Sequence, residues 1–224
     1  MLRDGHRLRD AARWHASTRA DAHRHGTGAV DVMSCRSQLT RTRCDLLTIW
    51  GDLACRWLPS GTVTTQLPDD LVLTPLGAQP RPLPEWLTTF HLASVVLDPY
   101  TNESSWVLKT AVRILDALRG CHARVNFIVT ADADDARRFL GPIADDFLVF
   151  CDPDRTVVSA LGLTSVPAFA FVRVDGAVAA SAEGWNPGEW RAVADDIVKT
   201  TSWLAPTIPV AGDPVAFAGT PAQG

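Results

Sequence analysis

The chain has 224 residues, enough to bury one good-sized core but few for two complete domains. Its net charge of −4 is uneven: residues 1–60 carry 10 Arg and 6 Asp, a net +4, whereas residues 61–224 carry 11 basic and 19 acidic side chains, a net −8. An acidic folded part argues against a nucleic-acid-binding face. We therefore expect one domain with flanking segments and no nucleic-acid partner.

The cysteines are odd in number and form no CxxC pair, which argues against a disulfide scaffold and against a zinc knuckle. They are Cys35, Cys44, Cys55, Cys121 and Cys151. Reduced thiols in a reducing compartment fit this pattern best. No apolar run reaches the roughly 18 residues of a membrane span, and the N-terminus MLRDGHRLRDAARWH lacks the apolar core of a signal peptide. We expect a cytoplasmic protein without a membrane span.

Two weaker patterns lie near the N-terminus. The tetrapeptide DLAC, residues 52–55, partly resembles a lipoprotein cleavage site, but Asp52 stands where such a site has an aliphatic residue. His23, His25 and Cys35 could together suggest a metal site, but their spacing fits no common one. We expect no metal and no cofactor.

Residues 1–37 are rich in Arg, His, Ala and Asp and show no apolar periodicity, so we predict a disordered tail. The pattern changes in residues 38–68. There an apolar stripe at i, i+4, i+7 and i+11 predicts an amphipathic helix followed by a linker. Its members are Leu46, Trp50, Leu53 and Trp57. Such a stripe packs on its own domain or on a partner protein.

Strands and helices alternate from residue 69 to 203. The predicted strands are 71–77, 92–97, 124–130, 147–151, 168–174 and 177–181, and residues 79–87 form a connector. The predicted helices run from near Thr101 to Gly120, over 134–140 and 155–161, and from near Pro187. Asp175-Gly176 is a hairpin signal. This order predicts an α/β sheet that is parallel first and antiparallel at its end, with a flexible tail over 204–224.

The segment FCDPDRTVVSALGLTSVPAFAFVRVDGAVAASAEGW, residues 150–185, resembles the second half of a thioredoxin-fold protein of the redoxin type. That group includes TlpA-like thioredoxins and peroxiredoxins. The shared features are a DPD turn before a short helix, LGL-x-x-VP, an apolar strand, DG and a second strand. LTPLGAQPRPLPEWL, residues 73–87, resembles the segment before the first core strand of the group.

The resemblance covers roughly residues 69–200 and implies a thioredoxin-like fold, with a mixed central sheet flanked by helices and here an N-terminal helical extension. It also implies that Pro167 is a cis-proline facing the first turn of the helix near Thr101. Where the family carries CxxC, this chain has Thr101, Asn102, Glu103 and Ser104, and where a peroxiredoxin carries TxxC the cysteine is again replaced by Ser104.

The replacement removes the usual chemistry, because a hydroxyl forms no disulfide and is a poor nucleophile without an adjacent base. His91 and His122 stand at the starts of parallel strands, whereas the Thr101 turn follows a strand end. Six residues of strand put roughly 20 Å between the two edges. We therefore expect neither histidine to reach the turn.

Cys151 is the one cysteine expected at the same edge as the turn, two strands away, which is about 10 Å. It is either a buried apolar residue or a regulatory or glutathione-accepting thiol. An enzyme that relies on Cys151, such as a glutathione- or peroxide-linked oxidoreductase, is one functional hypothesis. A structural or assembly protein that uses the Trp50 and Trp57 helix is another.

The hypothesis we favour is a redox-inert binding module for a peptide, a small thiol or a partner protein. Its groove would be formed by Thr101, Asn102, Ser104, Val166 and Pro167. Val166 precedes the family's cis-proline and would offer an exposed backbone N–H and C=O to an extended chain, as in strand addition.

Overall fold

The structure is a computed structural model that describes residues 65–222. The predicted disordered tail and amphipathic helix, and with them the N-terminal helical extension, lie outside the described residues. Within residues 65–222, no helix is long and apolar enough to cross a membrane.

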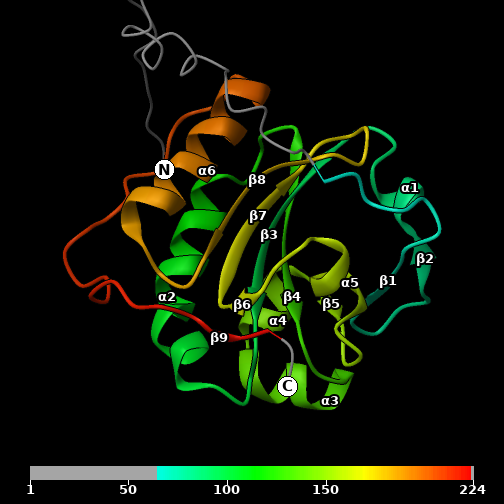
Figure 1. Cartoon of the computed structure of the whole chain (residues 1–224), viewed down its shortest axis with the longest axis horizontal. Coiled ribbons are helices and arrows are strands. Elements are labelled where there is room, and N and C mark those ends of the chain that lie inside the picture. Colours follow the sequence, from blue (N-terminus) through cyan, green and yellow to red (C-terminus); the bar gives the residue numbers. More distant parts are fainter. Residues whose placement is uncertain (1–64, 223–224) are drawn as a thin grey trace, which may run out of the picture. The chain divides into compact units, whose positions relative to one another are not determined.

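In the described part of the chain, seven strands form one sheet in the order β2-β1-β5-β4-β3-β7-β8 (Figure 1). They are β1 (Val72–Pro75), β2 (Arg81–Pro82), β3 (His91–Leu97), β4 (Ala123–Val129), β5 (Leu148–Cys151), β7 (Ala168–Val172) and β8 (Val178–Glu183). β3, β4 and β5 are parallel, whereas β7 pairs antiparallel with β3 and β8 antiparallel with β7. The predicted parallel strands with an antiparallel end are confirmed for β3, β4, β5, β7 and β8, whereas β1, the first predicted strand, pairs antiparallel with β5 and with β2.

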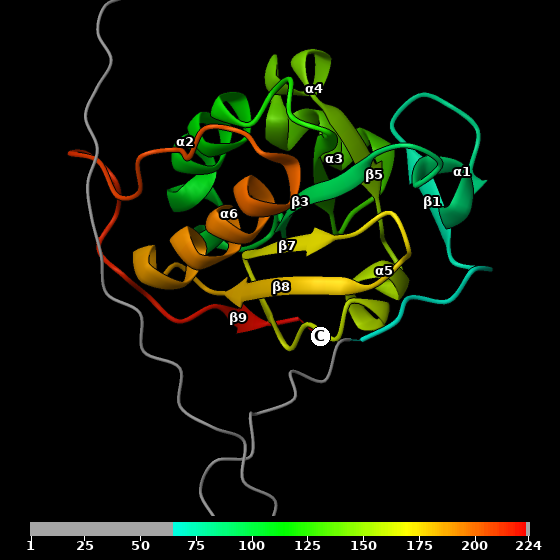
Figure 2. The same ribbon diagram turned by 90° about the horizontal axis from the view of Figure 1, so that it is seen from above.

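The helices pack on both faces of this sheet. They are α1 (Leu83–Trp86), α2 (Asn102–Ala117), α3 (Ala133–Leu140), α4 (Ile143–Asp146), α5 (Thr156–Ala160) and α6 (Pro187–Thr201). Side chains alternate along a strand, so Ala93, Val95 and Leu97 of β3 join a core with α2, α3 and α6. Leu92 and Val96 join a second core with α1 and α5. Figure 2 shows α2 and α6 apart from α5, across the strands.

The two long helices bury the stripes that the sequence indicates. On α2 these residues are Val107, Ala111, Ile114 and Leu115, with Leu118 at the C-cap. On α6 they are Trp190, Val193, Ala194 and Ile197. Trp190 packs edge-on against Trp185, with ring centroids 5.1 Å apart, and lies 5.2 Å from Phe169. These aromatic contacts fix α6 over the antiparallel end of the sheet.

Two short elements differ from the predicted pattern. The connector over 79–87 contains β2 and the single turn α1, which carries Pro84 at its second position, where proline is tolerated because the first N–H groups of a helix have no partner within it. α4 is one turn of helix between α3 and β5. Both are too short to produce a readable apolar period.

The C-terminal segment, residues 204–222, packs against the domain instead of forming the flexible tail that we expected. In Figure 1 it leaves α6, crosses α2 and reaches β6 (Ser165–Val166), where its β9 (Thr220–Pro221) forms a second, two-stranded sheet. Polar contacts hold most of it, and such contacts leave no apolar pattern in the sequence. For this reason composition alone indicated a loose tail.

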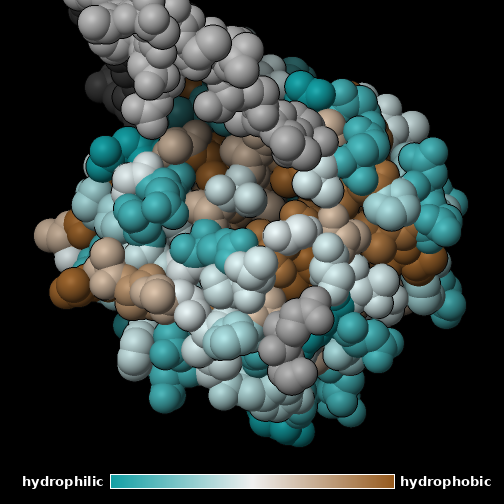
Figure 3. Space-filling model, in the orientation of Figure 1, coloured by the Kyte–Doolittle hydropathy of each residue, from teal (hydrophilic) through white to brown (hydrophobic). Residues whose placement is uncertain are grey.

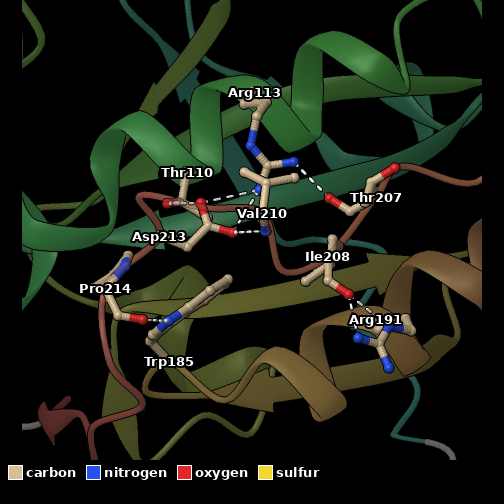
Figure 4. Close-up of polar contacts among 9 residues, drawn as sticks. All are labelled: Thr110, Arg113, Trp185, Arg191, Thr207, Ile208, Val210, Asp213 and Pro214. Atoms are coloured by element: carbon tan, nitrogen blue, oxygen red, sulfur yellow. Dashed lines mark hydrogen bonds and ion pairs between the residues drawn. The ribbon is translucent and has the colours of Figure 1, made fainter.

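Asp213 is the main anchor of the C-terminal segment (Figure 4). Its carboxylate accepts hydrogen bonds from Thr110 Oγ1 at 2.8 Å and from the Val210 N–H at 2.7 Å, and it forms a 2.8 Å ion pair with Arg113. Arg113 also donates to the Thr207 carbonyl, and Arg191 donates to the Ile208 carbonyl. Burial alone would raise the pKa of Asp213, but these hydrogen bonds and the guanidinium hold it below its usual value.

The lowered pKa of Asp213 predicts that acid releases the anchor. A carboxyl whose folded-state pKa is depressed stabilises the structure above its ordinary pKa, and this contribution is lost as the pH falls through the lowered value. The Trp185 indole N–H, which donates to the Pro214 carbonyl at 2.9 Å, is a reporter beside the anchor. Its NMR resonance should shift towards a solvent-exposed position on acidification, and in Asp213→Asn it should be displaced already at neutral pH. If the Trp185 resonance of the parent protein did not shift on acidification, this role of Asp213 would be contradicted.

Candidate functional site

The turn between β3 and α2 places two hydroxyls side by side. Thr101 is the N-cap of α2, as expected, and Ser104 lies in its first turn, fully buried. Thr101 Oγ1 lies 3.0 Å from Ser104 Oγ and 3.0 Å from the Asp98 carbonyl oxygen. Ser104 Oγ accepts a hydrogen bond of 2.9 Å from the Asp98 N–H. The two hydroxyls therefore bond within the turn, and Asn102 beside them is exposed.

Asp98 connects this turn to the rest of the site. The residue is only 3 % exposed; one oxygen of its carboxylate accepts from the Tyr100 N–H at 2.9 Å and the other pairs with Arg155 at 2.9 Å. Arg155 precedes α5 and also donates to the backbone carbonyl of Ala222, in the C-terminal segment. One arginine thus connects the turn before α2 with the end of the described chain.

The loop before β7 carries the expected proline geometry. The Val166–Pro167 peptide bond is cis. The Glu183 carboxylate, from β8, accepts hydrogen bonds from Thr164 Oγ1 at 2.6 Å and Ser165 Oγ at 2.7 Å. Burial alone would raise the pKa of Glu183, but these hydrogen bonds lower it below its usual value. Glu183 stays ionised and supports β6 through charge-assisted hydrogen bonds.

The expectation that Val166 offers an exposed backbone needs correction, because Val166 is fully buried. β6 pairs antiparallel with β9, in the register Ser165 to Pro221 and Val166 to Thr220. Thr220 Oγ1 donates to the Val166 carbonyl at 3.1 Å, and the Ala222 N–H donates to the Thr164 carbonyl at 2.7 Å. The chain's own C-terminal segment therefore occupies the edge that an added strand would take.

Further contacts hold this segment beside α2. Trp185 and Phe217 exchange two backbone hydrogen bonds of 2.9 Å. The Phe217 ring packs edge-on against Trp106 of α2, with ring centroids 5.6 Å apart. The C-terminal segment thus contacts both α2, which follows the hydroxyl pair, and the cis-proline loop.

Two glycines allow the close approach of the backbones. A Cβ on Gly184, whose φ is +66°, would lie 2.6 Å from the Phe217 carbonyl oxygen. A Cβ on Gly219 would lie 2.8 Å from the Val166 carbonyl oxygen. Both contacts are with backbone atoms, which cannot move aside as a flexible side chain can, so each position excludes every residue except glycine.

Cys151 lies two strands from β3, as predicted, and pairs with Thr74 of β1. It borders an open pocket of about 780 Å³ between β1 and α5 and is only 7 % exposed. Burial raises the pKa of its thiol, the Asp132 carboxylate raises it further, and Arg137 offsets this only in part. The pocket is also lined by four aspartates. They are Asp70, Asp132, Asp152 and Asp154.

The other titratable candidates have structural roles. His91 stands at the start of β3, where its Nδ1 accepts a 2.9 Å hydrogen bond from the Val174 N–H, and burial lowers its pKa. The Cys121 thiol is buried, with a raised pKa, and lies before β4 at the same edge. Within residues 65–222 there is no cluster of three or more His, Cys, Asp or Glu that could hold a metal ion.

The structure brings Thr101, Ser104 and Asp98 together and leaves Cys151 apart. Sequence analysis missed Asp98, Arg155 and the C-terminal segment. Asp98 directly follows a buried strand, and this position could have identified it. No sequence signal indicates Arg155, whose partners at residues 98 and 222 are distant along the chain.

No family model matches the sequence, and no curated protein matches it. Among solved structures, a hypothetical protein from Sinorhizobium meliloti 1021 is 17 % identical, with a TM-score of 0.51 and coverage of 72 % of this chain and 94 % of the other. A thioredoxin candidate from Neisseria meningitidis is 13 % identical, with a TM-score of 0.50 and coverage of 60 % and 91 %. The peroxidoxin BcpB from Mycobacterium tuberculosis is 16 % identical, with a TM-score of 0.48 and coverage of 62 % and 96 %.

At these identities the likeness concerns the fold alone. The two structures with TM-scores of 0.51 and 0.50 support the fold assignment, alongside the mixed sheet with helices on both of its faces. The chain therefore has a thioredoxin-like fold.

Proposed function

We propose that this protein is a thioredoxin-fold binding module that has given up dithiol chemistry and recognises an extended polypeptide at the β6 edge. The observation that supports this most directly is the hydroxyl pair of Thr101 and Ser104, 3.0 Å apart at the start of α2. In the resemblance these are the positions of the two cysteines. Oxygen in both positions leaves no sulfur to exchange electrons there.

The contacts of the pair do not indicate that either hydroxyl is activated as a nucleophile. Activation of a serine or threonine needs a base within hydrogen-bonding reach. The Ser104 oxygen instead accepts from the Asp98 N–H, and the carboxylate of Asp98 is paired with Arg155. These contacts fit a structural role for the hydroxyls, which hold the turn in shape.

The β6 edge supports the binding part of the proposal. Its backbone accepts and donates hydrogen bonds to a neighbouring strand, which is how strand addition provides affinity. The glycines at 184 and 219 let a second backbone come close. An edge with these properties is suited to an extended chain more than to a compact small molecule.

A thiol-dependent oxidoreductase that uses Cys151 is the second candidate, because this thiol borders a large open pocket. Against it stands the raised pKa of the thiol, which reduces the thiolate needed for attack on a disulfide or peroxide. The binding module therefore remains the preferred function.

The first prediction concerns catalysis. The purified parent protein should neither accelerate insulin reduction by dithiothreitol nor consume hydrogen peroxide, because both reactions need a reactive sulfur. Turbidity and peroxide assays measure the two rates. A rate clearly above background would overturn the proposal, and loss of that rate in Cys151→Ser would assign it to the second candidate.

The second prediction restores the missing pair. In a background with the five native cysteines changed to Ser or Ala, Thr101→Cys with Ser104→Cys should form an intramolecular disulfide. Thiol labelling after equilibration in glutathione buffers should show a cooperative two-electron transition between roughly −270 and −120 mV, the range of thioredoxin-fold dithiols. Thr101→Cys alone is the matched control and should form only mixed disulfides. A folded double variant that never closes would show that the turn does not hold the family's geometry.

The third prediction concerns Cys151. With the other four cysteines changed to Ser, its labelling by a disulfide reagent at neutral pH should be at least about tenfold slower than that of a cysteine placed at Thr101 in a cysteine-free background, since reactivity follows thiolate content and access. Denaturant should bring the two rates together. Equal rates in the folded proteins would favour the oxidoreductase.

A further inference from the structure

We infer that residues 217–222 are an intramolecular stand-in for the protein's partner, which is an extended peptide carrying an aromatic residue, a glycine two positions later and then a Thr-Pro pair. This inference rests on the proposed function and names the partner's chemistry. The site is closed as long as the C-terminal segment occupies it. A partner segment binds by exchange.

The first argument is that backbone contacts hold these residues. Phe217 bonds twice to Trp185, and β9 pairs with β6. The last described residue, Ala222, donates to the Thr164 carbonyl and accepts from Arg155. Backbone contacts of this kind are available to any extended chain, so a peptide from another protein can make the same set.

The second argument is that the site accepts only glycine at one position of the bound segment. A side chain at residue 219 would collide with the Val166 carbonyl oxygen at 2.8 Å, and a Cβ on Gly184 would lie 2.6 Å from the Phe217 carbonyl oxygen and 2.7 Å from the Gly219 nitrogen. A partner peptide therefore needs glycine where this chain has Gly219. The Thr220 hydroxyl, which bonds the Val166 carbonyl, selects a hydroxyl residue next to it.

The third argument is that the surface beside the β6 edge offers an aromatic residue of the partner a side chain to pack against. Trp106 is 56 % exposed on α2 and packs edge-on against Phe217, which is only partly buried. An exposed tryptophan beside a strand-addition edge is a suitable anchor for an aromatic side chain of the partner.

The fourth argument is that the segment can leave. Within 213–222 only Ala222 is fully buried, and Val215 is 88 % exposed. Figure 3 shows hydrophobic side chains exposed at the left margin of the surface, where Figure 1 draws the C-terminal segment before it reaches β9. Little apolar surface is buried by these residues, so their release costs mainly hydrogen bonds that a partner replaces.

The experiment uses the full chain and a fluorescent probe peptide with the sequence DPVAFAGTPA, which is that of residues 213–222. The parent should bind the probe weakly, because its own segment competes at the high effective concentration of a tethered ligand. Gly219→Ala in the chain loosens the segment without changing the site. This variant should bind the probe about tenfold more tightly, as expected for the loss of one or two hydrogen bonds.

Two controls separate exchange from a general effect. Gly188→Ala, outside the segment, introduces a Cβ at a glycine that, like Gly219, has no positive φ; its nearest neighbour would be Asn186 Oδ1 at 3.4 Å, an ordinary contact, and this variant should bind like the parent. A probe with alanine at the position of Gly219 should not bind Gly219→Ala. Gly184→Ala added to Gly219→Ala should abolish binding of the original probe. If that variant does not fold, the alanine probe still tests the close approach of the two backbones, at the Val166 carbonyl oxygen.

Equal affinity of the parent and Gly219→Ala, or equal affinity of both probes, would overturn the inference. So would a Gly219→Ala protein that becomes a dimer and excludes the probe, since the occupant would then be a second copy of the chain. These outcomes are independent of the insulin and peroxide assays. If the protein is redox-inert but does not bind the probe, only this inference is refuted. Activity in the insulin or peroxide assay would refute the proposed function.

Discussion

The central constraint in this domain is β3, which is paired on both sides and buried on both faces. β4 bonds to it in parallel and β7 antiparallel, and its side chains enter two separate cores. A strand held in this way has a fixed register, because a shift by one residue would exchange the two sets of side chains. Asp98 follows directly, so the position of the turn and of α2 is determined by the packing of β3.

The turn between β3 and α2 places two hydroxyl groups at the start of a helix, a position where hydroxyls gain little reactivity. Thr101 and Ser104 stand where a helix N-terminus would lower the pKa of a thiol, but hydroxyls titrate far above the physiological range and gain nothing comparable. What they contribute instead is internal bonding, with Ser104 accepting from the Asp98 N–H inside the protein. Under the proposed function, this internal bonding makes the turn a rigid support for its surroundings.

The C-terminal segment lies against the surroundings of this turn, namely α2 and the β6 edge. It is anchored at Asp213 by an ion pair and by hydrogen bonds, and beyond that point it is held mainly through its backbone. A firm anchor next to a loosely buried stretch limits how far the stretch can move when it leaves the β6 edge. Self-occupation of this kind protects an unpaired edge from unwanted association and sets a threshold for any partner.

The sequence by itself determined the elements with a strong apolar pattern. The continuous run of β3 and the stripes of α2 and α6 could be read directly, because burial imposes a period on each of them. The cis-proline position and the absence of thiols at Thr101 and Ser104 could also be read, from local motifs and from residue identity.

Only the tertiary structure decided which partners the site residues have. Arg155 meets Asp98 and Ala222 across 57 and 67 positions of sequence, and Thr220 meets Val166 across 54. Such contacts are polar, involve backbone atoms and have no period, so they leave no trace in a single sequence. The C-terminal segment was therefore read as a loose tail from its composition, although in the fold it pairs with β6 at Val166, whose backbone the sequence analysis had left open.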